Sequence, residues 1–326
     1  MTSVSAQSFE DIKVEAFKIC QDFLGQPWKG LSFSEFGFSE VSGGLSNSLY
    51  CCALPENTIV KNPQTPKQFI PSRTCKSKDY RLIYPDIARE LAKIHALEVP
   101  VRKVPDFWQK YFKKWLNEIE DETLQKYNKT FESGDMYREE FEWLTEEMKK
   151  TDSPVVYCHN DLQGGNILLR QDSASDGDHK LMLIDFEFGA YNYRGFDLAN
   201  QFCEWSFDYN TGEYPYFEVN FDQFPSEQEQ TSYIRAYLDQ LVLEGVFQPT
   251  DVESEIKTIL KEIDVFCMAA HLLWSLWSHK MTFLSVMDFA HKEHGKVRTQ
   301  AYFAIKEKYL KREICNGGSE LIVPDQ

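Results

Sequence analysis

A short polar segment between two apolar strands constrains this chain more than any other feature. Val155–Cys158 and Ile167–Leu169 have the apolar composition of buried strands, and the loop between them, 159–166, is polar apart from Leu162. Buried strands on both sides would fix the position of every loop side chain. Because rigidly held polar loops commonly carry binding and catalytic residues, we expect a functional site in this segment.

Three residues of this loop have the spacing of a kinase catalytic loop. His159, Asp161 and Asn166 follow the order His-x-Asp-Leu-x-x-x-Asn. A second apolar run, Leu181–Ile184, leads into Asp185, which is similar to the metal-binding Asp of the kinase Asp-Phe pair. Phosphoryl transfer requires an oriented acceptor hydroxyl and a metal ion that neutralises the phosphate. We therefore predict Asp161 as the catalytic residue, and Asn166 and Asp185 as Mg²⁺ ligands.

Each of these residues also has an ordinary structural interpretation. A single Asp or Asn after a strand is usually a turn or cap residue. A single histidine is more often structural than catalytic, and we retain that interpretation for His159. The joint occurrence of these residues in this order favours a kinase-like site. Asn160 stands where many protein kinases have arginine, and Glu187 follows the Asp-Phe pair where they have glycine. No Ala-Pro-Glu follows, so a small-molecule kinase is favoured over a protein kinase.

The rest of the chain is predicted to form one β-hairpin followed by a mostly helical body. Residues 33–54 alternate around Gly43-Gly44, which indicates two strands joined by a glycine turn. Residues 55–67 hold three prolines and are predicted to form a loop. A first helix is predicted to start at Pro85-Asp86. This order of elements indicates an α+β fold. Apolar residues at helical spacing predict further helices around 108–115, 137–148, 232–243, 251–279 and 296–311.

Composition and charge exclude several classes of function. The chain has 51 acidic and 35 basic residues, and the net charge of −16 disfavours nucleic acid as a partner and mildly favours a cationic ligand. No apolar run approaches the ~18–20 residues of a membrane span. The first ten residues lack the features of a secretory signal. The eight cysteines have no metal-type spacing, so we expect reduced thiols in a cytoplasmic protein.

Seven segments, spread in order over nearly the whole chain, carry a resemblance to one family. They are Val41–Leu49, Gln68–Arg73, His159–Asn166, Ile184–Glu187, Tyr191–Asp197, Phe202–Trp205 and Leu273–Trp277. On these segments the chain resembles the choline/ethanolamine kinase family, and within it the choline kinase branch. The resemblance implies ATP-dependent phosphorylation of choline, and of ethanolamine as a second acceptor, with Mg²⁺. This reaction is the first step of phospholipid head-group synthesis, and the family implies a homodimer.

The same resemblance implies a protein-kinase-like fold with two lobes. Residues 1–69 would form a shortened, β-rich N-terminal lobe that carries the glycine hairpin. Residues 70–326 would form a large, mostly helical lobe for catalysis and substrate binding. Within this lobe, Asp197 of the Arg194–Asp197 run is expected to have a structural role and to brace the catalytic loop.

Aromatic residues late in the chain point to a site for an ammonium group. Trp274 and Trp277 are three residues apart on a predicted helix and therefore share a face. A quaternary ammonium cannot donate a hydrogen bond, so it is held by aromatic faces and nearby carboxylates. The alternative is that these aromatic residues belong to the core. The resemblance implies a choline pocket formed by Glu204, Tyr209, Trp274, Trp277 and Phe289.

The nucleotide side departs from the family. Gly43, Gly44, Ser46 and Asn47 resemble the hairpin whose backbone N–H groups cover the ATP phosphates, although a glycine pair alone is typical of ordinary hairpins. Only Pro55–Lys67 separates this hairpin from Gln68, where the family has a further strand and helix.

This departure leaves other interpretations open. One is a catalytically impaired pseudokinase, or a shortened isoform, that binds choline or a dimer partner. Another is an aminoglycoside-type phosphotransferase, which would not be expected to carry the Trp274/Trp277 pair. His291-x-x-His294 has the spacing of a metal-ligand pair, but no third ligand is evident.

Overall fold

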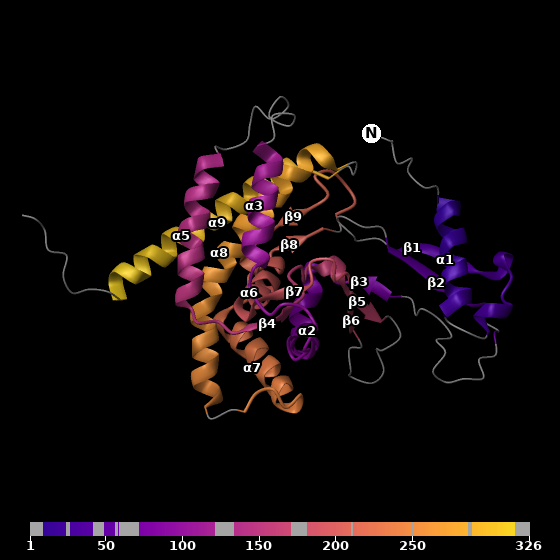
Figure 1. The fold of residues 1–326 in the computed structure, drawn as a ribbon, viewed down its shortest axis with the longest axis horizontal. Coiled ribbons are helices and arrows are strands. Elements are labelled where there is room, and N and C mark those ends of the chain that lie inside the picture. The colour runs from indigo at the N-terminus through magenta and orange to yellow at the C-terminus, as the bar shows by residue number, and fades with distance from the viewer. Residues whose placement is uncertain are drawn as a thin grey trace, which may run out of the picture. The chain divides into compact units, whose positions relative to one another are not determined.

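The computed structural model divides the chain into two compact units, and each is described by itself. Unit 1 comprises Met1–Cys75 and Ile167–Met182, and unit 2 comprises Lys76–Asn166 and Leu183–Gln326 (Figure 1). The assignment of separate functions to residues 1–69 and 70–326 stays a prediction. The structure describes residues 9–23, 27–41, 49–55, 58, 72–120, 134–170, 181–209, 211–248, 251–285 and 289–316.

Unit 1 contains one α-helix, two 3-10 turns, a pair of strands and a second small sheet among its described residues. Helix α1 (Phe9–Phe23) packs near the antiparallel strands β1 (Gly37–Val41) and β2 (Leu49–Ala53). The predicted pair of strands is therefore confirmed, while their connection at 42–48 lies outside the described residues. A small core of Cys20, Trp28, Phe36 and Leu54 lies beneath the hairpin. The second sheet has the order β3 (Ser72–Thr74), β5 (Ile167–Arg170), β6 (Leu181–Leu183).

Unit 2 is mostly helical, with two short two-stranded sheets. Strand β4 (Val155–Cys158) pairs antiparallel with β7 (Ala190–Tyr193), and β8 (Phe207–Asp208) pairs with β9 (Glu218–Val219). The long helix α8 packs against α3, α5, α6, α7 and α9 (Figure 1). The helices are α2 (Tyr80–His95), α3 (Phe107–Glu120), α5 (Gly134–Lys150), α6 (Arg194–Glu204), α7 (Glu227–Leu243), α8 (Val252–Leu284) and α9 (His291–Asn316).

The middle of α8 forms the core of this unit because its residues are mostly apolar on every side. From Val265 to Leu276 every residue is buried, as expected for a helix without a polar face. Helix α6 approaches α8 closely through Gly195, since a Cβ added there would lie 2.2 Å from Cδ2 of Phe266. The buried ion pair between Arg194 and Glu262 (2.9 Å) joins the same two helices. Gly195 therefore allows the helix contact that positions α6.

The predicted helices and strands are confirmed, with one error at the start of α2. This helix begins at Tyr80, so Pro85 lies inside it instead of at its first turn. The preceding turn is closed by Asp79, whose carboxylate accepts the Lys76 N–H at 2.8 Å. The Tyr80 ring stacks on Trp205 at 5.7 Å, which draws the first turn into the core. Tertiary packing thus outweighs the usual preference for proline at a helix start.

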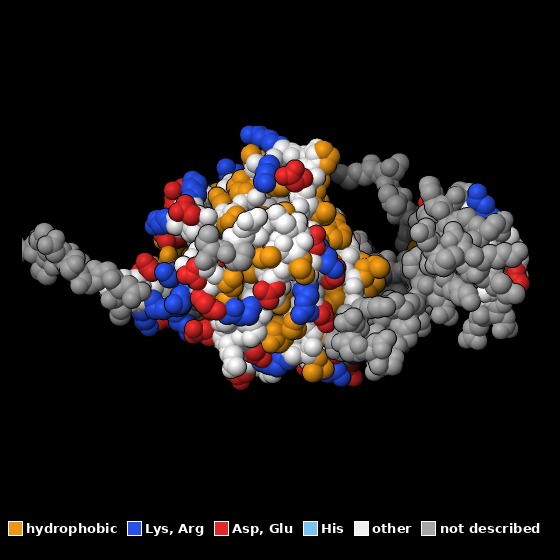
Figure 2. Space-filling view, turned by 90° about the horizontal axis from the view of Figure 1, so that it is seen from below, with side chains coloured by type: hydrophobic (Ala, Val, Ile, Leu, Met, Phe, Trp, Pro, Cys, Tyr) orange, Lys and Arg blue, Asp and Glu red, His pale blue; other side chains and the backbone are white. Residues whose placement is uncertain are grey.

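Two further expectations concern cysteines and membrane spans. The six cysteines whose side chains the structure describes are all free thiols. Within the described ranges, no helix has both the length and the apolar character that crossing a membrane requires. On the face shown in Figure 2, described acidic and basic side chains are interspersed. The net negative charge therefore does not form a single-sign patch on that face.

Candidate active site

The loop after β4 is held in place by a buried aspartate. Asp197, in the first turn of α6, accepts the backbone N–H groups of His159 and Asn160, both at 2.7 Å. His95 of α2 donates from Nε2 to the same carboxylate at 3.1 Å, and its Nδ1 accepts the Tyr237 hydroxyl at 2.8 Å. All these side chains are buried. The predicted bracing role of Asp197 is therefore confirmed, and it extends through His95 to α7.

His159 connects the loop to the segment that carries Asp185. Its Nε2 donates to the carbonyl of Ile184 at 2.8 Å, and its Nδ1 accepts the Asp161 N–H at 3.3 Å. Burial lowers the pKa of His159 below its usual range, so the ring is neutral at physiological pH. Both nitrogens are engaged with backbone, which supports the structural interpretation of this histidine.

Asp161 and Asn166 lie side by side within the loop. The Asn166 amide nitrogen donates to the Asp161 carbonyl at 2.8 Å and to its carboxylate at 3.1 Å. Asn166 also accepts the Ile184 N–H through its backbone carbonyl at 3.0 Å, one residue before Asp185. The two segments therefore bring the three predicted residues into one neighbourhood of unit 2.

Backbone geometry at both segments is unusual. Asn160 and Asp185 each have φ of 65°, the left-handed region that residues other than glycine seldom occupy. The Asn160 side chain stabilises this conformation, because it donates to the Phe188 carbonyl at 2.9 Å and accepts from Asn192 at 2.8 Å. Strained backbone held by surrounding hydrogen bonds is typical of functional sites.

The carboxyl group of Asp161 lies in a strongly negative environment. Burial raises its pKa well above the usual range, and the carboxylates of Glu204, Asp185 and Glu187 raise it further, while the hydrogen bond from Asn166 lowers it. A divalent cation would relieve this repulsion. Asp161, Asp185 and the amide oxygen of Asn166 offer the hard oxygen donors that Mg²⁺ prefers. The residues present therefore fit a magnesium site.

Glu204, a predicted substrate residue, belongs to a buried polar cluster. It accepts from the guanidinium of Arg298 and from the Tyr209 hydroxyl, the latter at 3.0 Å. Arg298 also donates to the Tyr209 oxygen at 2.9 Å and lies 3.8 Å above the Phe207 ring. The charge of Glu204 is therefore balanced within the protein. Burial raises the pKa of Tyr209 well above its usual range, which keeps its hydroxyl protonated.

The predicted aromatic residues come together through ring contacts. Trp274 and Trp277 are edge to face at 5.9 Å, and Phe289 lies 6.3 Å from Tyr209. His291 connects these two pairs, at 5.5 Å from Trp277 and 4.7 Å from Phe289. Trp274 is buried, and the other three aromatic residues are half-buried. We call Tyr209, Trp274, Trp277, Phe289 and His291 the aromatic cage.

Arg298 and the roles of His291 and His294 were not predicted from the sequence. His294 does not form a metal pair with His291, because its Nδ1 contacts Ser278 at 2.7 Å and its Nε2 contacts Tyr209 at 3.3 Å. A signal was nevertheless present in the sequence. Spacings of three and four residues place His291, His294 and Arg298 on one face of α9, although the predicted helix covered only 296–311.

Two other groups of residues lie outside this site or have a structural role. Gly43, Gly44, Ser46 and Asn47, predicted to cover the ATP phosphates, lie outside the described residues. In the described part of the chain, His95, Cys158 and Asp197 place their ligand atoms within 4.8 Å of one another. Because His95 and Asp197 are already committed to the bracing of the loop, this trio has a structural explanation.

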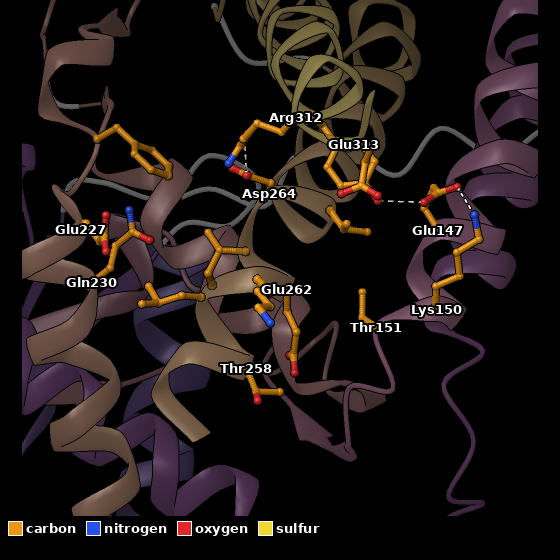
Figure 3. A pocket seen from close by; sticks show the side chains of 16 residues that line it. Glu147, Lys150, Thr151, Glu227, Gln230, Thr258, Glu262, Asp264, Arg312 and Glu313 are labelled. Carbon is orange, nitrogen blue, oxygen red and sulfur yellow. Dashed lines mark hydrogen bonds and ion pairs between the residues drawn. The ribbon is translucent and has the colours of Figure 1, made fainter. Parts of the chain in front are cut away.

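A cavity elsewhere in unit 2 is separate from these residues. It has a volume of about 860 Å³ and is lined by side chains of α5, α7, α8 and α9 (Figure 3). Its charged groups pair with one another, as Glu147 does with Lys150 at 2.5 Å and with the Tyr309 hydroxyl at 2.9 Å. Arg312 pairs with Asp264. None of the predicted site residues lines it, so the candidate site remains the loop and the aromatic cage.

Comparisons with known proteins identify a family for the chain. The model of the family described as Choline/ethanolamine kinase matches residues 65–303. Choline kinase alpha of Mus musculus is 31% identical, with 90% of this chain and 80% of the relative covered. That alignment is 368 residues long, whereas this chain has 326, so the mouse protein has residues that this chain lacks.

Two solved structures share the fold, which is mostly helical with small sheets. A choline kinase from Cryptosporidium parvum Iowa II has a TM-score of 0.72 at 22% identity, with 92% of this chain and 97% of that chain covered. A Plasmodium vivax ethanolamine kinase has a TM-score of 0.68 at 19% identity, with 94% of both chains covered. The family match over residues 65–303 and the 31% identity to the mouse relative show that the chain belongs to the choline/ethanolamine kinase family of phosphotransferases.

Proposed function

We propose that this chain transfers the γ-phosphate of ATP to the hydroxyl group of choline or of a less methylated amino alcohol such as ethanolamine. One observation carries the proposal. Glu204, which hydrogen-bonds Tyr209 of the aromatic cage, is close enough to Asp161 to raise the pKa of its carboxyl group. A small amino alcohol bound by its ammonium group in the cage would therefore have its hydroxyl near Asp161.

Asp161 would orient the acceptor hydroxyl and accept its proton. Asp161 can accept that proton only when its carboxyl group is ionised, and a bound divalent cation would favour the ionised form against the burial and the acidic neighbours that raise its pKa. The hydrogen bond from Asn166 and the bracing by Asp197 hold the carboxylate in place. Asn166 and Asp185 would hold Mg²⁺, which when bound neutralises the charge on the phosphates.

The ammonium group would be bound by aromatic faces, with a carboxylate behind them. Trp274, Trp277 and Tyr209 offer ring faces, and each cation–π contact contributes roughly 0.5–2 kcal/mol. Because Arg298 already balances Glu204, this carboxylate contributes mainly by orienting the Tyr209 hydroxyl. The pocket would therefore select its ligand by shape and by ring contacts more than by net charge.

The nucleotide would be covered by Gly43, Gly44, Ser46 and Asn47. Residues 1–69 would form a shortened lobe. This agrees with the alignment to the mouse relative, which is longer than this chain and therefore contains residues that this chain lacks. The same observation supports a second candidate, a family member that binds the amine or a dimer partner without turnover. A homodimer and a place at the start of phospholipid head-group synthesis remain predictions from the family, and a cytoplasmic location remains a prediction from the sequence.

Product analysis distinguishes the two candidates. The full chain is incubated with Mg·ATP and either choline or ethanolamine, and phosphomonoester formation is followed by ³¹P NMR. Calorimetric titrations with ATP and with each amine are run separately. The proposal predicts product and measurable binding of both ligands. Amine binding without nucleotide binding or product would favour the second candidate. No amine binding at all would refute the proposal and would leave, of the second candidate, only the binding of a dimer partner.

A further inference from the structure

His291 is a buried histidine whose polar atoms have no explained role. The residue is 3% exposed, and neither ring nitrogen has a hydrogen-bond partner among the described residues. His294, one turn later in α9, differs because both of its nitrogens contact other side chains. Buried polar groups are nearly always hydrogen-bonded, and one left unpaired costs about 1–3 kcal/mol. The unpaired nitrogens of His291 therefore point to a ligand.

The position of His291 indicates which ligand this is. The ring lies between Trp277 and Phe289, with centroid distances of 5.5 Å and 4.7 Å. Both neighbours belong to the aromatic cage in which the ammonium group is proposed to bind. Within the described part of the chain, His291 is thus the member of the aromatic cage whose two ring nitrogens both have no hydrogen-bond partner.

The ring of His291 is neutral at physiological pH. Burial lowers its pKa to about 4, and its place as the first residue of α9 puts it at the positive end of the helix dipole. A neutral imidazole has one nitrogen that donates and one that accepts a hydrogen bond. It therefore adds no positive charge to the cage, and it offers a lone pair to a cation.

This lone pair distinguishes between types of ammonium group. Primary, secondary and protonated tertiary amines carry an N–H that can donate to the acceptor nitrogen of His291. The quaternary nitrogen of choline carries only methyl groups, so it would leave that nitrogen unpaired inside the cage. The ring faces attract both kinds of cation. A hydrogen bond to His291 is therefore available to the first kind alone.

We propose that His291 makes this site favour amino alcohols that keep an N–H on their ammonium group over choline. The inference rests on the proposed function and names its preferred substrate class. The most direct comparison uses choline and N,N-dimethylethanolamine, because the second differs only by a proton in place of one methyl group. Hydrogen bonds to charged groups are strong enough for a preference of roughly tenfold.

The test measures kcat/KM and calorimetric Kd for both amines near neutral pH, where both are cationic. The wild-type chain is compared with His291→Phe, which keeps a ring but has no acceptor, and with His291→Asn, which keeps an acceptor oxygen. Trp277→Phe is the matched control, since it weakens ring contacts with both amines. Circular dichroism establishes that each variant is folded.

The wild type is expected to favour dimethylethanolamine roughly tenfold. In His291→Phe the kcat/KM values for the two amines should become nearly equal, because dimethylethanolamine loses its hydrogen bond and its kcat/KM falls. His291→Asn should retain part of the preference, and Trp277→Phe should leave the ratio unchanged. If the preference for dimethylethanolamine over choline were the same in wild type and His291→Phe, or if the wild type preferred choline, the inference would be overturned while the proposed function would stand. If the wild type neither binds nor phosphorylates either amine, the proposed function fails, and the inference fails with it.

Discussion

Replacement of Asp197 by asparagine tests whether this side chain positions the catalytic loop. One carboxylate oxygen accepts the His159 N–H at 2.7 Å and His95 at 3.1 Å, and the other accepts the Asn160 N–H at 2.7 Å. Asparagine has the same shape but only one acceptor oxygen. In either orientation its NH₂ group faces a buried backbone N–H, which then has no acceptor.

The expected cost follows from these contacts. One buried donor left without a partner costs about 1–3 kcal/mol, and the remaining bonds lose the assistance of a full charge, about 1 kcal/mol more. Asp197→Asn should therefore lower the free energy of unfolding by about 2–4 kcal/mol. Displacement of Asp161, which follows the braced residues directly, should lower kcat by roughly 10–100-fold. Amine affinity should change little, because Trp274 and Trp277 lie on α8.

Urea unfolding and steady-state kinetics measure both effects. Asp264→Asn is the matched control, because it makes the same chemical change at a partly exposed carboxylate paired with Arg312. Surface pairs contribute about 0–1 kcal/mol, so the control should lose no more than that and keep its kcat. If Asp197→Asn were no less stable than Asp264→Asn and equally active, the bracing role derived from the structure would be wrong.

Three further predictions concern unit 2, and urea unfolding measures each. Gly195→Ala should destabilise the chain by about 1–3 kcal/mol through its clash with Phe266, whereas helix propensity alone would stabilise it by about 1 kcal/mol. Arg298→Met should cost about 3–5 kcal/mol by leaving Glu204 buried without its cation; a loss below ~1 kcal/mol would contradict this. Burial lowers the pKa of His279 from 6.5 to about 4, so the folded state binds fewer protons and stability falls as the pH drops through this window. When the pH is lowered from 7 to 5, the free energy of unfolding should therefore fall by about 2 kcal/mol less in His279→Gln than in wild type.

Much of the candidate site could be predicted because its signals are local in the chain. His159, Asp161 and Asn166 lie within one loop between two strands, and Asp185 follows shortly after a third. Short spacing fixes such residues relative to one another whatever the rest of the chain does. Asp197 was expected as a brace for the same loop, and the structure confirms its hydrogen bonds.

The remaining parts depend on which helix faces meet. Glu204 and Arg298 are 94 positions apart, and periodicity shows only that each lies on a buried face of its helix. Which residues oppose each other depends on how α6 and α9 pack on α8. The prediction that α2 starts at Pro85 was wrong for a related reason, since the Tyr80–Trp205 stack joins segments far apart in sequence.

The central claim is that Asp161 takes part in phosphoryl transfer to an amino alcohol bound in the aromatic cage. The most direct measurement compares wild type with Asp161→Asn for Mg·ATP-dependent product formation, with amine Kd measured by calorimetry on the same samples. The account predicts product from the wild type and a loss of roughly 10²–10⁴-fold in kcat for the variant, with amine Kd nearly unchanged. Ordinary turnover by Asp161→Asn, or no product from a wild-type chain that binds both ATP and amine, would contradict it.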